Sequence, residues 1–242
     1  MCFLSIVIPA YKEEKRLPVS LPQIIQFVRQ QPYTVEVIVV NDGSRDRTVE
    51  VAKTFEKEVD FIHLLSVEHG GKGHAVKAGM LQAKGEYRFL CDCDLSMPIV
   101  EVNKFLPPSL SGYDIAIGSR EAPGSRRYNE PYFRHLTGRV FNTLVRFLAV
   151  KGLQDTQAGF KCIHGKAAEQ LFRLQTIKGW GFDVELLMIA QHNQQRIVEV
   201  PINWYFNRDS RVNVLRDTYR MVNEVWRVHQ NVRRGLYDLP RE

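Results

Sequence analysis

Short runs of apolar, β-branched residues alternate in the first half of the chain with segments whose apolar residues recur at helical spacing. The runs that predict strands are Leu4–Ala10, Val35–Asn41, Phe61–Val67, Tyr87–Cys91 and Tyr113–Gly118. Strands that alternate with helices form a mainly parallel sheet with helices packed on its faces. The alternation therefore predicts an α/β fold, and 242 residues with 44% hydrophobic composition fit a single domain around one sizeable core.

The segments between these strands predict helices that cover the sheet. Apolar residues keep helical spacing from 17 to 28 and from 48 to 55, and a third helix is expected at Gly73–Lys84, where Gly85 ends it. Further along, the polar stretch Glu121–Tyr132 holds two prolines and a glycine and predicts a mobile loop. The elements expected after it are helices at His135–Val150, Phe182–His192 and Val212–Val232 and a strand at Ile197–Tyr205.

Charge and cysteine content narrow the setting of the protein. A formal charge of +6 and a sequence pI of about 9.2 favour anionic partners such as phosphates, nucleic acid or an acidic membrane face. No nucleic-acid-binding module is recognisable, so we do not expect nucleic acid as the partner. Cys91 and Cys93 lack the spaced second pair of a zinc site, which predicts buried thiols in a reducing compartment. Without a signal peptide or an apolar run near ~20 residues, we expect a cytoplasmic protein, soluble or peripheral to a membrane, with no transmembrane helix.

Two carboxylates close the fourth predicted strand, in the sequence CDCDLS at 91–96. Alternate side chains of a strand share a face, so Asp92 and Asp94 are expected to point the same way at the carboxyl end of the strand, where open α/β sheets bind ligands. A divalent cation that bridges to diphosphate oxygens would relieve their repulsion. The alternative is a solvated acidic turn, because D-x-D also occurs by chance.

Three other segments carry candidate binding residues. Asp42, in the sequence NDGS after the second strand, either forms a turn and helix cap or accepts hydrogen bonds from a base or ribose. The first strand ends in PAYKE, which offers the aromatic face of Tyr11 and the carboxylate of Glu13 in the same layer. The turn GGKG at 70–73 precedes a helix and makes Lys72 a candidate for a donor phosphate, but without P-loop spacing a simple tight turn is the alternative.

Together these segments resemble a known family. The order IVIPAYKEE, VIVVNDGSRDRT, HGGKGHAVKAGM, FLCDCDLSMP and IAIGSR is similar, over residues 4–120, to the family 2 glycosyltransferases of GT-A fold. The resemblance implies a nucleotide held by Pro9, Tyr11, Glu13 and Asp42, and Mg²⁺ or Mn²⁺ with the diphosphate held by Asp92 and Asp94. In that family a glutamine often stands two places after the second aspartate. Ser96 stands there in this sequence, which puts metal ligation by this side chain in doubt.

The second half narrows the resemblance. VKGLQDTQAGFK at 150–161 and GWGFDVELL at 179–187 look like the polyprenyl (dolichyl) phosphate hexosyltransferases, above all the dolichyl-phosphate glucose synthase branch, with coverage of about residues 4–215. This implies a nucleotide-sugar and metal half at 1–120 and an acceptor half at 121–242. It also implies an inverting transfer of a hexose, glucose favoured, from UDP-glucose to a polyprenyl phosphate. Eukaryotic members carry an N-terminal membrane anchor that this sequence lacks, so we expect the lipid to be reached from the membrane surface.

Cations are needed to bring two anionic substrates together, since a phosphate monoester is already charged near neutral pH, with a second pKa of roughly 6. Guanidinium groups suit phosphate, and the candidates for the acceptor clamp are Arg120, Arg134, Arg208 and Arg211. For each arginine the alternative is a surface salt bridge. The catalytic set that we expect is Asp92, Asp94, Arg120, Asp155 and Gln157.

The remaining residues of these motifs have open assignments. Asp155 and Gln157 are expected to bind sugar hydroxyls or to order the acceptor loop. Trp180 either stacks on the sugar ring or belongs to the core. Two further carboxylates could pair with Lys161 or Arg120, namely Asp183 and Glu185.

The final predicted helix is amphipathic and basic. It places Leu215, Tyr219, Val222 and Trp226 on one face, and seven arginines lie between 208 and 234. Such a helix either packs on its own domain with its cations in water or lies against anionic lipid. The rival functions are a GDP-mannose-dependent polyprenyl-phosphate mannosyltransferase, a family 2 transferase with a non-lipid acceptor, and a nucleotide-sugar-binding module without activity.

Overall fold

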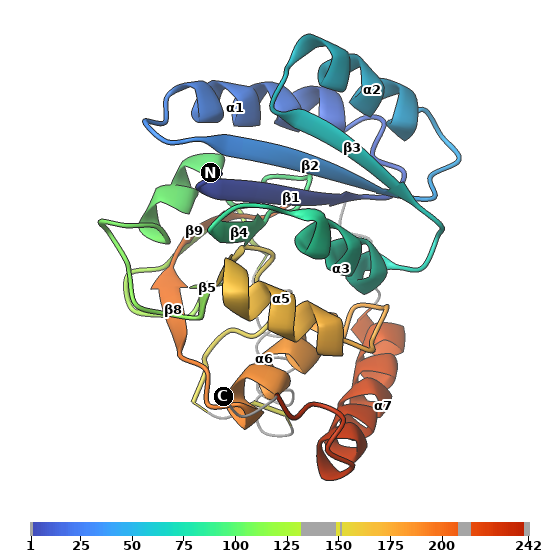
Figure 1. The fold of residues 1–242 in the computed structure, drawn as a ribbon, viewed down its shortest axis with the longest axis vertical. Helices are drawn as coiled ribbons and strands as arrows, with labels where there is room; N and C mark the ends of the chain where they lie inside the picture. The colour runs from blue at the N-terminus through green and yellow to red at the C-terminus, as the bar shows by residue number, and fades with distance from the viewer. Residues whose placement is uncertain (1, 132–148, 151, 208–213, 240–242) are drawn as a thin grey trace.

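A mixed sheet lies at the centre of the molecule (Figure 1). The structure is a computed structural model that describes residues 2–131, 149–150, 152–207 and 214–239, the side chains of 214–221 excepted. Within these residues the strands of the sheet are β1 Leu4–Ala10, β2 Val35–Asp42, β3 Ile62–Val67, β4 Tyr87–Leu90, β5 Ile115–Ser119, β7 Lys161–His164 and β8 Ile197–Pro201. They run in the order β3-β2-β1-β4-β7-β5-β8, with only β7 antiparallel to its neighbours among them. The predicted mixed, mainly parallel sheet is confirmed.

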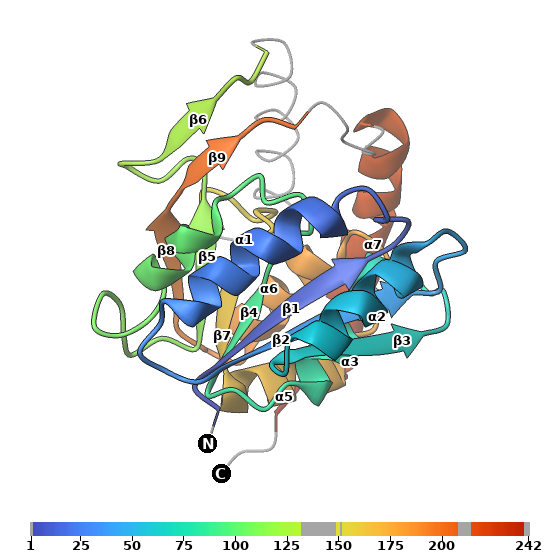
Figure 2. The same cartoon turned by 90° about the horizontal axis from the view of Figure 1, so that it is seen from above.

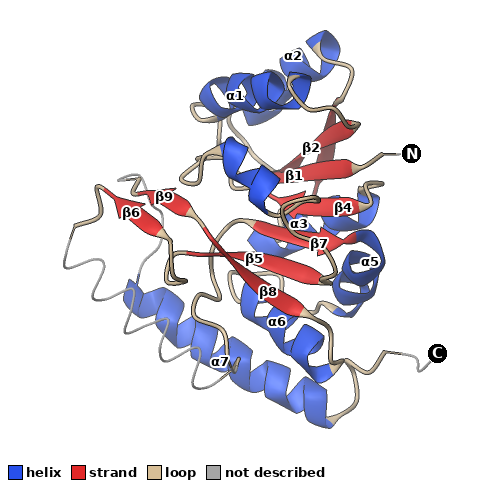
Figure 3. Ribbon diagram, turned by 90° about the vertical axis from the view of Figure 1, so that its left-hand side faces the viewer, coloured by secondary structure: helices blue, strands red, loops and turns tan. Residues whose placement is uncertain are grey.

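Helices cover both faces of this sheet (Figures 1 and 3). Their bounds are α1 Leu17–Arg29, α2 Thr48–Glu58, α3 Lys72–Gln82, the 3₁₀ helix η1 Ile99–Lys104, α5 Gly165–Leu174, α6 Phe182–His192 and α7 Val214–Arg233. Ile6 and Ile8 of β1 pack in one apolar cluster with α1, α2 and η1, and Val7 packs in the other with α3, α5 and α6. This division follows from the alternation of side chains along a strand.

The stretch Ile197–Tyr205, predicted as one strand, is two. β8 belongs to the main sheet, whereas β9 (Asn203–Tyr205) pairs with β6 (Arg126–Tyr128) in a separate two-stranded sheet that stands away from the main one (Figure 2). The chain changes sheets at Ile202, whose N–H donates to the carbonyl of Ser119 and whose carbonyl accepts from the first residue of β6. β6 lies in the stretch predicted as a mobile loop, so that prediction is wrong for these three residues.

β7 and α5 were not predicted. β7 has four residues, too few to display a period of two, and it enters the sheet between β4 and β5 through pairings with residues distant in the sequence. The helix predicted at His135–Val150 lies outside the described residues except for 149 and 150.

The last helix, α7, turns a different face to the core from the predicted one. Val225 and Val228 are buried with the α6 side of the sheet, whereas Val222 and Trp226 are 40% and 64% exposed. The side chains of 215 and 219 lie outside the described residues. Among the described helices, none combines the length and the apolar character that crossing a bilayer requires.

The carboxyl ends of β2, β1 and β4 meet at one edge of the sheet. The register pairs Ala10 with Asn41 and Val7 with Leu90, and all three strands are parallel. The segments PAYKE, NDGS and CDCD follow or close these strands. The fold therefore brings the candidate residues of three separate motifs to the edge where open α/β sheets bind ligands.

Candidate active site

The carboxylate of Asp42 holds the glycine turn that precedes α3. Its Oδ1 accepts the N–H of Gly70 at 2.8 Å and its Oδ2 accepts the N–H of Gly71 at 3.0 Å. His69 Nδ1 lies 2.8 Å from Oδ2, and the side chain of Asp42 is 4% exposed. Asp42 thus fixes the turn that carries Lys72, and the expected hydrogen bonds from its carboxylate to a base or ribose stay a prediction.

Tyr11 and His69 form an aromatic wall beside this turn. Their rings stack with centroids 4.3 Å apart and planes 18° apart. Glu13 donates its backbone N–H to Thr48 Oγ1 at 2.8 Å, and its buried carboxylate receives Arg16 at 3.3 Å. Flat aromatic faces at this edge suit a planar base.

Glycines 71 and 73 are required by close contact with the segment before α6. A Cβ on Gly71 would lie 2.8 Å from the carbonyl oxygen of Lys178, and one on Gly73 would lie 2.8 Å from that of Ile177. Gly71 also has φ of 102°, a conformation that favours glycine. The interpretation as a tight turn therefore holds, and the turn sets Lys72 at the first residue of α3.

Lys72 and Asp92 form an ion pair at the site. Nζ lies 2.6 Å from Asp92 Oδ1, with the two side chains 16% and 29% exposed. Nζ also lies 5.0 Å from the ring centroid of Trp180, which is 46% exposed and so is not a core residue. Burial alone would lower the pKa of Lys72, but the charges of Asp92, Asp183 and Asp94 raise it overall. Lys72 is therefore a stable ammonium group among carboxylates.

Asp183 is held behind this pair by a buried lysine. Lys161 Nζ lies 2.7 Å from Asp183 Oδ1 and donates to the carbonyl of Ala158 at 2.6 Å. The suggested pairing of Asp183 with Lys161 is confirmed. Glu185 instead accepts hydrogen bonds from Thr176, Ile177 and Tyr237.

The cysteines that alternate with the two aspartates point into the core. Cys91 and Cys93 are free and buried, as predicted. Burial raises the pKa of Cys91 well above its usual value and that of Cys93 to about 12, so both stay thiols. Asp92 and Asp94 are partly exposed instead, as alternation along an extended segment requires.

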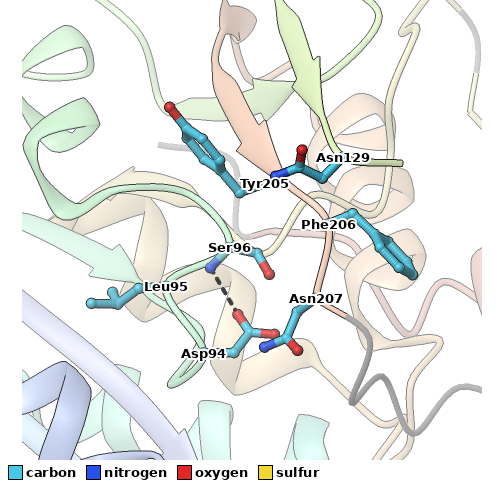
Figure 4. A pocket seen from close by; sticks show the side chains of 7 residues that line it. All are labelled: Asp94, Leu95, Ser96, Asn129, Tyr205, Phe206 and Asn207. Atoms are coloured by element: carbon cyan, nitrogen blue, oxygen red, sulfur yellow. Dashed lines mark hydrogen bonds between the residues drawn. The ribbon is translucent and has the colours of Figure 1, made fainter. Parts of the chain in front are cut away.

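Asp94 borders a pocket of about 730 Å³ at the end of β9 (Figure 4). The lining residues are Asp94, Leu95, Ser96, Asn129, Tyr205, Phe206 and Asn207. Asp94 Oδ1 accepts the N–H of Ser96 at 3.0 Å. Figure 4 shows the carboxamide of Asn207 beside the carboxylate of Asp94.

Arg120 and Asp155 form a two-pronged ion pair at the carboxyl end of β5. Arg120 donates from Nε at 2.7 Å, from Nη2 at 2.9 Å and from its backbone N at 3.0 Å to the carboxylate of Asp155. Burial alone would raise the pKa of Asp155, but the charge and hydrogen bonds of Arg120 lower it to about 2. The carboxylate is 0% exposed, so it holds Arg120 and does not meet sugar hydroxyls directly.

Comparison with known proteins decides the family. The sequence model of glycosyl transferase family 2 matches residues 5–172. The chain is a family 2 glycosyltransferase. Human dolichyl-phosphate beta-glucosyltransferase is 38% identical over 216 residues, which cover 83% of this chain and 67% of the human one; for the Drosophila melanogaster enzyme of the same name the values are 36%, 83% and 66%. The chain spans about two thirds of the length of these relatives.

The fold of this glycosyltransferase has solved counterparts. A Mycobacterium tuberculosis glucosyl-3-phosphoglycerate synthase with Mn²⁺ and UDP-glucose is 20% identical, with a TM-score of 0.67 over 93% of this chain and 78% of that one. The likeness confirms the predicted GT-A fold.

The donor groups of this glycosyltransferase fit a hard divalent cation. Among the residues that the structure describes, no three His, Cys, Asp or Glu side chains gather into a metal site. The pocket instead offers oxygen atoms from Asp94, Asn207 and Ser96. Mg²⁺ and Mn²⁺ prefer oxygen, and magnesium usually takes one or two protein carboxylates and completes its shell with phosphate and water.

The remaining residues of the expected site are four. Arg134, Arg208 and Arg211 lie outside the described residues. The backbone N–H of Gln157 donates to Asp155 Oδ1 at 3.3 Å, which places Gln157 in the turn that Asp155 opens.

Sequence reasoning missed three residues of the site. His69 precedes the glycine turn, Asn207 follows β9, and Glu199 of β8 accepts the N–H groups of Gln154 and Asp155, both at 2.9 Å. His69 is the first residue of HGGKGHAVKAGM, a segment already quoted but given no role at this position, and Asn207 lies two residues after a predicted strand, so both were within reach of sequence reasoning. Glu199 lies in a strand and carried no such signal.

Proposed function

We propose that this glycosyltransferase moves a hexose, with glucose favoured, from a nucleotide diphosphate sugar, with UDP-glucose favoured, to a polyprenyl phosphate, with inversion at the anomeric carbon. The observation that carries the proposal is the ion pair of Lys72 with Asp92, which sets an ammonium group beside the D-x-D carboxylates. An ammonium and two carboxylates at this edge suit a diphosphate that arrives with a divalent metal. The names of the relatives support glucose and a dolichyl phosphate acceptor.

On the donor side, the wall of Tyr11 and His69 receives the base, and Lys72 meets the diphosphate. Pro9, in β1, and Glu13, whose backbone N–H donates to Thr48 Oγ1, lie on the same segment as Tyr11 and are expected to contribute to the same nucleotide site. Asp42 acts indirectly, since its carboxylate keeps the turn before Lys72 in place.

Mg²⁺ or Mn²⁺ would be held by Asp94 with the amide oxygen of Asn207, with Asp92 adjoining, and would stabilise the negative charge of the departing diphosphate. Asp94 is fixed for this task by the N–H of Ser96. Ser96, which stands where the family often has a glutamine, thus contributes its backbone N–H to Asp94, and the second oxygen would come from Asn207 at the end of β9.

On the acceptor side, Arg120 binds the phosphate of the lipid. Asp155 occupies its Nε and Nη2, and Nη1 makes no hydrogen bond with any residue that the structure describes. A phosphate monoester is already anionic near neutral pH, with a second pKa of roughly 6, so its oxygen attacks the anomeric carbon without a general base. What the protein supplies is charge and position.

The exposed part of α7 supports contact with an anionic membrane surface. Trp226 is 64% exposed, and Arg227, Arg233 and Arg234 are exposed on the same helix and its end. An interfacial helix combines such aromatic and basic side chains. We propose that it brings the site to the lipid.

The test is to assay Asp92→Ala and Asp94→Ala with labelled UDP-glucose, Mn²⁺ and a polyprenyl phosphate in detergent. Turnover should fall about 100-fold or more in each, the loss typical of removing transition-state charge stabilisation. Asp60→Ala, at an exposed carboxylate outside the site, is the matched control. Turnover at the wild-type rate in both variants would overturn the proposal, and faster transfer from GDP-mannose would reassign the donor.

A further inference from the structure

Gly159 lies directly opposite Asp92. β7 pairs antiparallel with β4, with Lys161 opposite Leu90. Continued two residues past Leu90 and two residues back from Lys161, the same register sets Gly159 against Asp92. The first aspartate of the D-x-D motif therefore has a fixed neighbour in the second half of the chain.

No side chain fits on Gly159 while Asp92 keeps its position. A Cβ there would lie 1.9 Å from Asp92 Oδ2, 2.6 Å from its Cγ and 3.3 Å from its Oδ1. Cβ atoms in proteins do not approach other heavy atoms this closely, so either the loop or the carboxylate must move. Gly159 does not adopt positive φ, so close approach and not backbone conformation is the reason for a glycine here.

The loop that carries Gly159 is fixed at both ends. At its start, Asp155 pairs with Arg120, and Glu199 accepts the backbone N–H of Asp155 at 2.9 Å. At its end, the carbonyl of Phe160 accepts the N–H of Gly118 at 2.8 Å, and Phe160 is 0% exposed. Because a move of the loop would break these contacts, the carboxylate of Asp92 gives way first.

We infer that Gly159 is a positioning residue: the absence of its side chain lets Asp92 take the orientation in which it pairs with Lys72. The inference rests on the proposed function for its catalytic meaning. It also assigns one loop to both substrates, because the residue that holds Arg120 and the residue that makes room for Asp92 lie four positions apart.

A double-mutant cycle between the two positions tests this inference. Gly159→Ala, Asp92→Ala and the double variant are compared by thermal unfolding and by the Kd of UDP in the presence of Mn²⁺. Gly159→Ala should lower Tm by roughly 2–4 °C in the wild-type background, because the carboxylate of Asp92 must turn away and lose its ion pair with Lys72. In the Asp92→Ala background, where the clashing atoms are gone, the same change should leave Tm nearly unaltered.

Binding gives the second readout. Gly159→Ala should weaken UDP binding with Mn²⁺ by about 10-fold or more, the size of effect found when the support of a metal site is removed, and the double variant should bind no worse than Asp92→Ala. Gly118→Ala is the matched control: its Cβ would meet nothing nearer than 3.2 Å, and Asp92 is not among its neighbours. Any loss of Tm in that control should persist in the Asp92→Ala background.

Two results would overturn the inference: an equal loss of Tm from Gly159→Ala with and without Asp92, or unchanged UDP binding in Gly159→Ala. If Gly159→Ala does not fold, the double variant should fold, and its failure to do so also contradicts the inference. Unchanged UDP binding in Asp92→Ala alone would instead contradict the proposed function, while the unfolding cycle would still decide the role of Gly159.

Discussion

The donor side and the acceptor side of this site are built in different ways. On the donor side, Asp42 ends β2 and Asp92 follows β4, the two parallel strands on either side of β1, and the register of the sheet alone brings them to one edge. On the acceptor side, Arg120 is fixed by Asp155, 35 positions away, and Asp155 by Glu199, 44 positions further on. One side is thus set by the order of strands, and the other by contacts that exist only in the folded chain.

The two sides also differ in what satisfies their charges. The side chain of Asp92 is 29% exposed, and its partner Lys72 has a long, flexible side chain whose ammonium group can turn to a diphosphate. Asp155 is 0% exposed and receives three hydrogen bonds from Arg120 and one from the N–H of Gln157. The donor side therefore keeps its charges open to ligands, whereas the acceptor side holds one arginine in a preorganised position.

The largest expected effect comes from the acceptor side. Arg120→Ala should lower kcat/KM for the lipid phosphate by about 1000-fold, because it removes the cation for the acceptor and leaves Asp155 buried without its cationic partner. Asp155→Asn should raise the KM for the lipid about 10-fold, since Arg120 keeps its charge but loses one prong of its support. Steady-state kinetics with lipid varied at saturating UDP-glucose measures both.

If the two sides of the site are built independently, Asp155→Asn should leave nucleotide binding on the donor side nearly unchanged. The Kd of UDP with Mn²⁺ should change by less than about 3-fold in Asp155→Asn, since the donor carboxylates have partners of their own. Arg120→Lys is the matched variant, because it keeps the charge and loses the planar fork. A loss of UDP affinity as large as the loss of lipid affinity would show that the two sides are one unit.

The sequence predicted the strands and the open carboxylates of the donor side because local chemistry and strand order agree there. The β-branched runs located β1 to β5 to within one or two residues, and D-x-D at a strand end predicted the open carboxylates. Alternation predicted the buried thiols of Cys91 and Cys93. These features depend on a few adjacent residues, so no knowledge of tertiary packing was needed.

The acceptor side could not be predicted in the same way. The four residues of β7 show no period, yet their insertion sets Gly159 against Asp92 and Asp155 against Arg120. The motif around Asp155 suggested a sugar contact, and only the burial of this carboxylate shows that it acts through an arginine. Long-range pairing is the physical reason, because it is decided by packing and leaves no local pattern.

A smaller effect is expected when the pH is lowered, because the ion pair of Arg120 with Asp155 then loses its contribution to stability. The pKa of Asp155 is lowered to about 2, against roughly 3.9 in unfolded chains, so its contribution is fully present above about pH 4 and is lost as the pH falls through about 2. The shift corresponds to about 2 kcal/mol of unfolding free energy. The stability difference between wild type and Asp155→Asn should therefore shrink by about this amount from pH 5 to pH 2.

Urea unfolding at a series of pH values measures this difference. Asp46→Asn is a useful control, because hydrogen bonds from Thr48 outweigh its burial and also lower the pKa of Asp46, but this carboxylate is more open to solvent. Its difference from wild type should change less over the same range. A constant difference for Asp155→Asn between pH 5 and pH 2 would mean that Arg120 does not hold this carboxylate in its charged form.

The smallest expected effect concerns the residue that crosses the division between the two sides. Asn207 follows β9 in the second half of the chain, yet Figure 4 shows its carboxamide beside Asp94 of the donor side. If its oxygen ligates the cation, Asn207→Ala should weaken Mn²⁺ binding in the presence of UDP about 10-fold, as measured by electron paramagnetic resonance titration. Asn207→Asp should bind Mn²⁺ at least as tightly as wild type, because it keeps an oxygen and adds a charge.

Asn129→Ala, on another part of the same pocket, should leave Mn²⁺ affinity unchanged. Equal affinities in Asn207→Ala and wild type would confine the protein ligands of the metal to the D-x-D motif.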